Sequence, residues 1–353
     1  MAEKTLKEKT AKEIYIKKIV MMDKKNVVED IDQLVEETNK IHKCQVCQNK
    51  LNNVSYIGEE RMFGMGDKFS YFKCANCGCL QISTIPKNLN KYYPSNYYSY
   101  SLGKNPKSFK SKVADYALKH AIATRLGYFD IVGTLAMLYN CYYQKVYPFL
   151  DKAICDFSSK ILDVGCGNGF LLNQLNLMGF SNLTGVDPFL ESDICYPNGV
   201  NIYKKYISEL EGKYDLIMLH HSFEHMSDPI SVFSHLERLL ALNGTIIIRV
   251  PVVDGYAWRK YGMNWFQVDA PRHFFLHTKK SISLLTKKYG LKIVKIEFDS
   301  TEAQILESER YLENIPLLDE YIVPETLRDA AKKKAGELNL LMDGDQACFY
   351  IKR

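Results

Sequence analysis

The stretch from Ile161 to Leu172 constrains this chain more than any other part of the sequence. It reads ILDVGCGNGFLL, in which four residues of strand character precede a turn with three glycines and an apolar run that can open a helix. Glycine lets the backbone pass close to a ligand, and the first amides of a helix stabilise an anionic group. The pattern predicts a strand, turn and helix with an anionic ligand group at the turn.

The identity of residue 170 narrows the kind of ligand. The dinucleotide fingerprint needs its third glycine here, and Phe170 occupies the position, so a bound pyrophosphate is disfavoured. Eighteen residues after Gly169, the apolar strand LTGVD ends in Asp187. A carboxylate at that place can accept hydrogen bonds from both hydroxyls of a ribose. The turn and the acid together are more specific than either alone.

Four successive motifs resemble those of class I S-adenosylmethionine (SAM) dependent methyltransferases. They are DVGCGNG, VDP at 186–188, YDLIMLHHSFEHMSDP at 214–229 and LNGTIIIRVP at 242–251. The resemblance covers about residues 157–353 and implies a Rossmann-like, seven-stranded α/β domain that binds SAM. The sequences CQVC, CANCG, KYYPSNYYSY and WFQVDAPRHFFLHT are similar to a bacterial subfamily that modifies sugars and surface polysaccharides. This similarity implies a role in polysaccharide biosynthesis.

Strand and helix patterns alternate along the same part of the chain. Alternation of this kind predicts a parallel sheet with helices on both faces and a ligand beyond the carboxyl ends of the strands. Strands are expected near 160–165, 182–187, 200–204, 214–219, 244–250, 291–298 and 347–352. The last of them is expected to be antiparallel, after a helical insertion over 299–346.

Two CxxC pairs, Cys44 with Cys47 and Cys74 with Cys77, predict a metal site. Each pair can present two thiolates, at ~2.3 Å from one tetrahedral zinc. The sequence shows no secretory signal, which favours a cytoplasmic location and metal ligands over disulfides. A redox dithiol would need only one pair. We expect a structural zinc, because four protein ligands leave no open position and the segment has few large apolar residues of its own.

The predicted organisation has four parts. They are a helical N-terminal extension over 1–40, a zinc-binding module with a tyrosine-rich tail over 41–100, a helical linker or lid over 101–155, and the methyltransferase domain over 156–353. The tyrosines, among them Tyr92 and Tyr93, can stack on a ligand ring or seal the seam between two domains. The second role is slightly favoured.

The cofactor-binding residues are implied by the resemblance, position by position. Asp163 and the glycine turn suit the amino-acid part of SAM, Asp187 suits the ribose, and the turn ending at Ile207 suits adenine. Capping of the turn is an equal alternative for Asp163. The full expected set is Asp163, Gly165, Cys166, Gly167, Asn168, Gly169, Asp187, Pro188, Tyr206, Ile207, His220 and His221.

The loop VDAPRHFF supplies the expected catalytic residues. Methyl transfer needs alignment and exclusion of water, and a sugar hydroxyl also needs a base with a pKa near the working pH. We expect His273 as that general base, Asp269 to orient it or bind a hydroxyl, and Arg272 to bind an anionic substrate group. The alternative is that His273 and Arg272 tie the loop to the sheet edge. For Glu224 and His225, a local capping or hydrogen-bonding role is preferred.

Several functions remain open at this stage. The preferred one is O-methylation of a sugar, nucleotide sugar or surface-glycan precursor; C- or N-methylation of a deoxysugar is the alternative. Nucleic-acid methylation is disfavoured because the net charge is only +5 and the lysines are scattered. A non-catalytic SAM-binding scaffold is disfavoured by the intact turn and ribose acid. The expected partner is a small-molecule carbohydrate, without nucleic acid or a membrane span, and a homo-oligomer is compatible with the sequence.

Overall fold

The computed structural model describes residues 42–93, 119–121, 123–124, 130–132, 134 and 156–353. The expected extension over 1–40 lies outside these residues, as do the tyrosine-rich tail after Tyr93 and most of the expected linker. Two β-sheets organise the described part of the chain. Among the described helices, none has the length and apolar character needed to cross a membrane.

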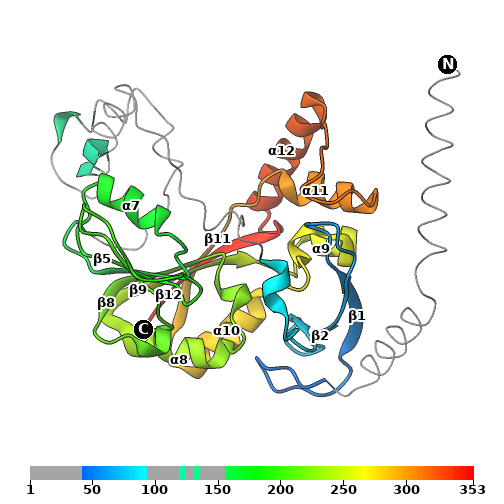
Figure 1. Ribbon diagram of the computed structural model, residues 1–353, viewed down its shortest axis with the longest axis horizontal. Helices are drawn as coiled ribbons and strands as arrows, with labels where there is room; N and C mark the ends of the chain where they lie inside the picture. The colour runs from blue at the N-terminus through cyan, green and yellow to red at the C-terminus, as the bar shows by residue number, and fades with distance from the viewer. Residues whose placement is uncertain (1–41, 94–118, 122, 125–129, 133, 135–155) are drawn as a thin grey trace, which may run out of the picture.

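The larger sheet has eight strands in the order β11-β12-β9-β8-β4-β5-β7-β6 and runs through the centre of Figure 1. The strands are β4 (Ile161–Val164), β5 (Leu183–Val186), β6 (Ile194–Cys195), β7 (Asn201–Tyr203), β8 (Tyr214–His220), β9 (Leu240–Pro251), β11 (Lys292–Phe298) and β12 (Gln346–Lys352). β4, β5, β7, β8 and β9 are parallel, whereas β12 is antiparallel to both of its neighbours. The expected α/β fold is confirmed, and the two-residue strand β6 is an addition.

Helices cover both faces of this sheet. Because successive strand residues point to opposite faces, β8 buries Leu216 on one side and Ile217 on the other. The face of Leu216 packs against α7 (Phe170–Leu177), and the face of Ile217 packs against α8 (Pro229–Leu239) and α10 (Lys279–Lys288). Each fully buried Leu or Ile stabilises the fold by about 1.5–3 kcal/mol. The carboxyl ends of the parallel strands thus lie on a rigid three-layer base.

The smaller sheet joins the cysteine-containing segment to the rest of the chain. Its order is β1-β2-β3-β10, with β1 (Val54–Glu59), β2 (Lys68–Lys73) and β3 (Leu80–Ile82) as antiparallel neighbours. The fourth strand, β10 (Phe275–Leu276), comes from the loop after β9 and pairs with β3. This sheet therefore crosses the domain boundary that the sequence predicts.

The remaining elements are short helices and one helical pair. They are η1 (Leu89–Tyr92), η3 (Ile207–Glu209), η4 (Phe223–His225), α9 (Tyr256–Tyr261), η5 (Gly262–Asn264), η6 (Phe266–Val268), α11 (Ala303–Leu312) and α12 (Glu325–Leu340). α11 and α12 lie in the segment expected as a helical insertion over 299–346. They contact each other, and α11 also contacts α9, at the upper right of Figure 1.

Candidate active site and cysteine cluster

The turn between β4 and α7 needs glycine at two positions. Gly165 and Gly169 have φ angles of +74° and +76°, which L side chains rarely adopt. A Cβ atom on Gly165 would lie 2.4 Å from Cβ of Ser222, and one on Gly169 would lie 2.5 Å from Cδ1 of Ile202. The turn therefore packs against β7 and the loop after β8, where a side chain would have no room.

Asp187, directly after β5, is held by the glycine turn. Its Oδ2 accepts a hydrogen bond from the amide of Gly167 at 3.0 Å, and its Oδ1 accepts one from the amide of Phe189 at 2.9 Å. Burial raises the pKa of Asp187, although these two bonds oppose the rise. The pKa of the buried Asp163 is raised to about 7, by burial and by the charge of Asp187. Of the two acids, Asp187 has the more stable negative charge.

The first amides of the turn bond to protein groups. Those of Gly165 and Cys166 donate to the carbonyl of Val186 at 2.8 and 3.3 Å, and that of Gly167 donates to Asp187. The sequence led us to expect these amides to be open to an anionic ligand group, and for these three donors the structure corrects that expectation. The observed role of the turn is close packing of backbone against the neighbouring strands.

A cavity of about 640 Å³ opens beside the turn. Its volume lies within the range of about 300–1,000 Å³ that is usual for small-molecule sites. The predicted cofactor-binding residues in its wall are Gly165, Gly167, Asp187, Pro188, Tyr206, Ile207 and His221. The predicted residues outside its wall are Asp163, Cys166, Asn168, Gly169 and His220.

The rest of the cavity wall combines three distant segments. The cysteine-containing segment, the η4–α8 region and the loop before β10 meet there. The residues are Ile85, Leu89, Asn90, Tyr93, His225, Met226, Asp228, Ser231, Val232, His235 and Phe274. Tyr93 thus faces a cavity, whereas Tyr92 is buried where the cysteine-containing segment meets Arg272, so Tyr92 is an example of the seam role and stacking on a ligand stays a prediction.

Two histidines near this part of the cavity wall have the same tautomer. Nδ1 of His225 lies 2.8 Å from the carbonyl oxygen of Arg272, and Nδ1 of His273 lies 2.7 Å from that of Gln267. A carbonyl can only accept, so Nδ1 carries the proton and Nε2 keeps its lone pair in each neutral ring. His225 lines the cavity, whereas His273 is 6% exposed and is not in the wall. Burial and the nearby His225 lower the pKa of His273 to about 4.

Glu224 lies behind the two histidines. It is completely buried, and its Oε1 lies 3.5 Å from Nδ1 of His221. Burial alone would raise the pKa of Glu224, but His221 and the charges of His225 and His273 lower it to about 2. Glu224, His225 and His273 each offer a potential ligand atom, and these atoms lie within 4.8 Å of one another. The structure therefore brings two histidines and one buried carboxylate close together.

Arg272 is completely buried and contacts protein groups. Its Nε lies 3.0 Å from both carboxylate oxygens of Asp269, and its Nη2 lies 2.6 Å from Oδ1 of Asp269 and 2.8 Å from Oε1 of Glu60. Nη1 donates to the carbonyl of Tyr92 at 3.3 Å. Neither Arg272 nor Asp269 lines the cavity. Binding of an anionic substrate group by Arg272 stays a prediction, and the contacts in this structure are those of the tying role.

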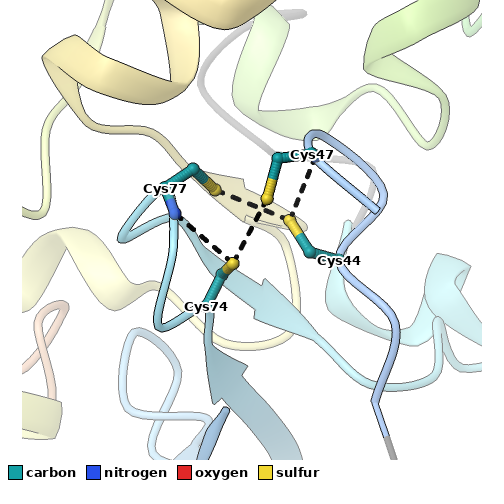
Figure 2. Close-up of side chains that lie close together, drawn as sticks. All are labelled: Cys44, Cys47, Cys74 and Cys77. Carbon is teal, nitrogen blue, oxygen red and sulfur yellow. Dashed lines mark hydrogen bonds between the residues drawn. The ribbon is translucent and has the colours of Figure 1, made fainter. Parts of the chain in front are cut away.

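The four expected cysteines converge in Figure 2, with sulfur atoms from two turns directed toward one another. Sγ of Cys44 lies 3.5 Å from that of Cys77, and Sγ of Cys47 lies 3.5 Å from that of Cys74. Tetrahedral zinc with bonds of ~2.3 Å places sulfurs about 3.8 Å apart, so the donor set fits. Nε2 of Gln81 donates to Sγ of Cys44 at 2.9 Å, as an outer partner of a thiolate ligand would. These thiols can hold a metal ion.

Sequence reasoning did not place His225 in a cavity wall and did not single out Asn90 or Glu60. His225 and Glu224 lie in a single turn of 3-10 helix, where no periodicity marks a buried face. The only local signal was their place after the fourth expected strand. Asn90 and Glu60 belong to the cysteine-containing segment. Nothing in the sequence shows that Asn90 lines the cavity or that Glu60 contacts Arg272.

The chain resembles known methyltransferases. Residues 138–296 match a family described as a methyltransferase domain. Relatives include ubiquinone biosynthesis O-methyltransferases of Escherichia coli and Shigella boydii, each 25% identical over 166 residues, 44% of this chain and 68% of the relative. Similar structures include a SAM dependent methyltransferase from Archaeoglobus fulgidus, with 23% identity and a TM-score of 0.35 over 55% of this chain and 85% of that chain. A cyclopropane synthase from Mycobacterium tuberculosis has 16% identity and a TM-score of 0.39 over 68% of this chain and 94% of that chain.

The family match and the doubly covered, mostly parallel sheet define a class I SAM-dependent methyltransferase domain. The chain is therefore a SAM-dependent methyltransferase, and SAM is its cofactor.

Proposed function

We propose that this enzyme methylates a hydroxyl group of a sugar, a nucleotide sugar or a surface-glycan precursor. The observation that carries the proposal is one continuous cavity. Its wall includes the glycine turn and Asp187, which we call the cofactor end, and His225 and Tyr93, which we call the acceptor end. A methyl donor and an acceptor must meet in line, with water excluded, and a single cavity with two different ends provides this.

The wall at the acceptor end suits a ring with several hydroxyls. Asn90, Asp228 and Ser231 offer hydrogen-bonding groups, whereas Leu89 and Phe274 offer apolar surface. Sugar rings need both kinds of contact, because their edges are polar and their faces are not. The expected carbohydrate acceptor is therefore consistent with the wall, and an acceptor from ubiquinone biosynthesis is the alternative that the relatives' names suggest.

His225 is the histidine that we propose to take the hydroxyl proton. It lines the cavity, and its Nε2 is the free acceptor because Nδ1 donates to the carbonyl of Arg272. His273, the base expected from the sequence, lies behind it and is neutral at pH 7. We assign to His273, Glu224 and Asp269 the support of positive charge on His225 during proton transfer, since both carboxylates have lowered pKa values.

At the cofactor end, Asp187 is proposed to accept hydrogen bonds from the ribose, and the segment at Tyr206 and Ile207 to contact adenine. SAM supplies an electrophilic methyl group when it is bound. Support for these roles is the position of all three residues in the same wall as Gly165. Asp163 and His220 do not line the cavity, so we propose that they affect SAM binding indirectly, by supporting the backbone of the turn and of the strand end.

The cysteine cluster is proposed to hold a structural zinc. Its support is the four-thiol donor set and the short S···S distances. Elemental analysis of the purified chain should give about one zinc per molecule; a value well below one in protein that methylates normally would contradict the assignment.

C-methylation of a keto sugar remains the second candidate. The same Nε2 of His225 could take a proton from carbon beside a carbonyl. The relatives named as O-methyltransferases favour oxygen. A cytoplasmic location and a homo-oligomer stay predictions.

The proposal is tested with a methyl-transfer assay over nucleotide sugars, keto sugars, phenols and RNA. We expect transfer to a sugar hydroxyl, and a loss of about 10²–10⁴-fold in kcat for His225→Ala. His235→Ala is the matched control, because His235 lines the same cavity on α8. Equal turnover by His225→Ala and the wild type at saturating acceptor would refute the role of His225, and transfer to RNA alone would refute the acceptor class.

A further inference from the structure

The loop that carries the expected catalytic residues is held by the cysteine module, which we define as residues 42–93. The hydroxyl of Tyr71 donates to the carbonyl of His273 at 3.0 Å, and the amide of Ile82 donates to the carbonyl of Phe274 at 2.9 Å. The pairing of β10 with β3 continues this contact. The backbone of the loop is thus part of the module's sheet.

The metal-binding turns themselves contact the residues that follow this loop. The hydroxyl of Thr278 donates to the carbonyl of Cys77 at 2.6 Å, and Nζ of Lys280 donates to the carbonyl of Asn76 at 2.6 Å. A Cβ atom on Gly78 would lie 3.0 Å from Cγ2 of Thr278, so the two segments are in close contact. The turns of the cysteine cluster are therefore in direct contact with the start of α10.

A buried ion pair fixes the other end of the loop. Glu60 and Arg272 are both 0% exposed, and Nη2 of Arg272 lies 2.8 Å from Oε1 of Glu60. The carboxylate of Glu60 also accepts from the amides of Phe63, at 3.1 and 3.2 Å, and of Met65, at 3.0 Å. Loss of one partner would leave an uncompensated buried charge, so the pair holds its geometry firmly.

The same arginine forms a hydrogen bond with the protonated nitrogen of His225. Its backbone carbonyl accepts from Nδ1 of His225 at 2.8 Å, while its guanidinium is clamped between Glu60 and Asp269. Without that carbonyl in place, the ring could carry its proton on either nitrogen, and only one tautomer leaves Nε2 as an acceptor. Arg272 thus links the cysteine module to His225, because its side chain contacts Glu60 and its carbonyl contacts His225.

We infer that Glu60 and Arg272 are positioning residues, through which the cysteine module fixes His225 in the tautomer with a free Nε2. The inference rests on the proposed function of His225. It makes the cysteine module a working part of the acceptor site, in addition to a wall of the cavity. Glu60, which lies far from His225 in the sequence, then determines turnover without contacting substrate.

The test compares Glu60→Gln with Glu59→Gln. Glu59 is the adjacent residue and forms a partly exposed pair with Arg61 at 3.3 Å, so it is a matched control. We expect Glu60→Gln to lower kcat by about 10–100-fold, with the KM for SAM changed less than about twofold, because the reacting group is misplaced while the cofactor end is intact. Glu60→Asp, which keeps the charge, should recover part of the loss.

The tautomer is measured directly from the imidazole ¹⁵N shifts of His225, assigned by their loss in His225→Gln. In the wild type, we expect a protonated Nδ1 and an unprotonated Nε2; in Glu60→Gln, a mixture. A wild-type ring protonated at Nε2, or a Glu60→Gln variant with unchanged shifts, overturns the inference. The wild-type spectrum decides even if Glu60→Gln does not fold. Failure of the proposed function gives a different result, namely full turnover by His225→Ala.

Discussion

The two ends of the cavity are built in different ways. The cofactor end comes mainly from one continuous stretch, from β4 to η3, to which only His221 and Ser222 after β8 are added. The acceptor end joins the cysteine module, η4 and the loop before β10. The comparison teaches that the proposed cofactor wall is specified mostly by neighbouring segments, whereas the proposed acceptor wall depends on the assembly of segments far apart in the sequence.

Removal of the metal should give the largest difference between the two ends, because it should lower methyl transfer much more than SAM affinity. A structural zinc contributes ~10–16 kcal/mol to the folding of small modules, and its loss should release the loop before α10. For Cys44→Ser we expect methyl transfer to fall at least 100-fold while SAM affinity changes only a few-fold. Cys195→Ser, at an exposed cysteine, is the control. A metal-free protein, verified by elemental analysis, that transfers methyl groups at the normal rate would break the comparison.

A substitution in the glycine turn should act on the opposite end. Gly165→Ala places a Cβ atom 2.4 Å from Ser222 in a backbone with φ of +74°, and overpacking of this kind costs ~1–3 kcal/mol. We expect SAM affinity to fall by at least tenfold. Gly199→Ala has the same backbone strain, with φ of +88°, but no atom within 4 Å of the new methyl group, so its SAM affinity should not change. An equal loss of SAM affinity in the two variants would show that backbone strain, rather than packing at the turn, reduces SAM binding.

Acid should destabilise the strand end and loop that carry the buried histidines. Burial lowers the pKa values of His220, His273 and His277 from 6.5 to about 3, 4 and 3. Between pH 6.5 and 4, the unfolded chain binds protons that the folded chain does not. The free energy of unfolding should therefore fall as pH falls through this window, by up to ~1.4 kcal/mol per pH unit for each histidine.

Urea unfolding at pH 7 and pH 5 measures this slope. Asp163 and Asp345, whose pKa values are raised to about 7 and about 6, act in the opposite direction, because the folded chain binds their protons at a higher pH than the unfolded chain does. His277→Phe should remove the contribution of one histidine. Phenylalanine suits the site because His277 is stacked between Phe223 and Phe275. Glu224, whose lowered pKa acts in the same direction, adds to the loss only below pH 4.5. A change in unfolding free energy between pH 7 and pH 5 that is the same in His277→Phe and the wild type would contradict the assignment.

The smallest expected effect belongs to Tyr93. Its hydroxyl lies 3.3 Å from Nδ1 of His225 and it lines the acceptor end. Loss of one hydrogen bond costs ~0.5–1.5 kcal/mol, so Tyr93→Phe should raise the KM for the acceptor about two- to tenfold. The KM for SAM should stay the same. A change confined to the KM for SAM would place Tyr93 at the wrong end.

The same contrast explains what could be predicted from the sequence. Gly165, Asp187 and the four cysteines were found because spacing within a short segment carries their meaning, and the long strands were found because their apolar pattern is regular. The base assignment went to His273 because it stands beside charged residues in the sequence. Only the fold shows that Arg272 forms an ion pair with Glu60 and that His225 lines the cavity. Strands of two residues, such as β10, have no pattern to detect.

Titration calorimetry with S-adenosylhomocysteine tests the central claim, a cofactor end anchored on Asp187. The wild type should bind one molecule per chain, and Asp187→Ala should weaken binding at least tenfold, because it removes the carboxylate next to the glycine turn. His225→Ala, at the acceptor end, should bind as the wild type does. No binding by the wild type, or equal binding by Asp187→Ala, would contradict the account.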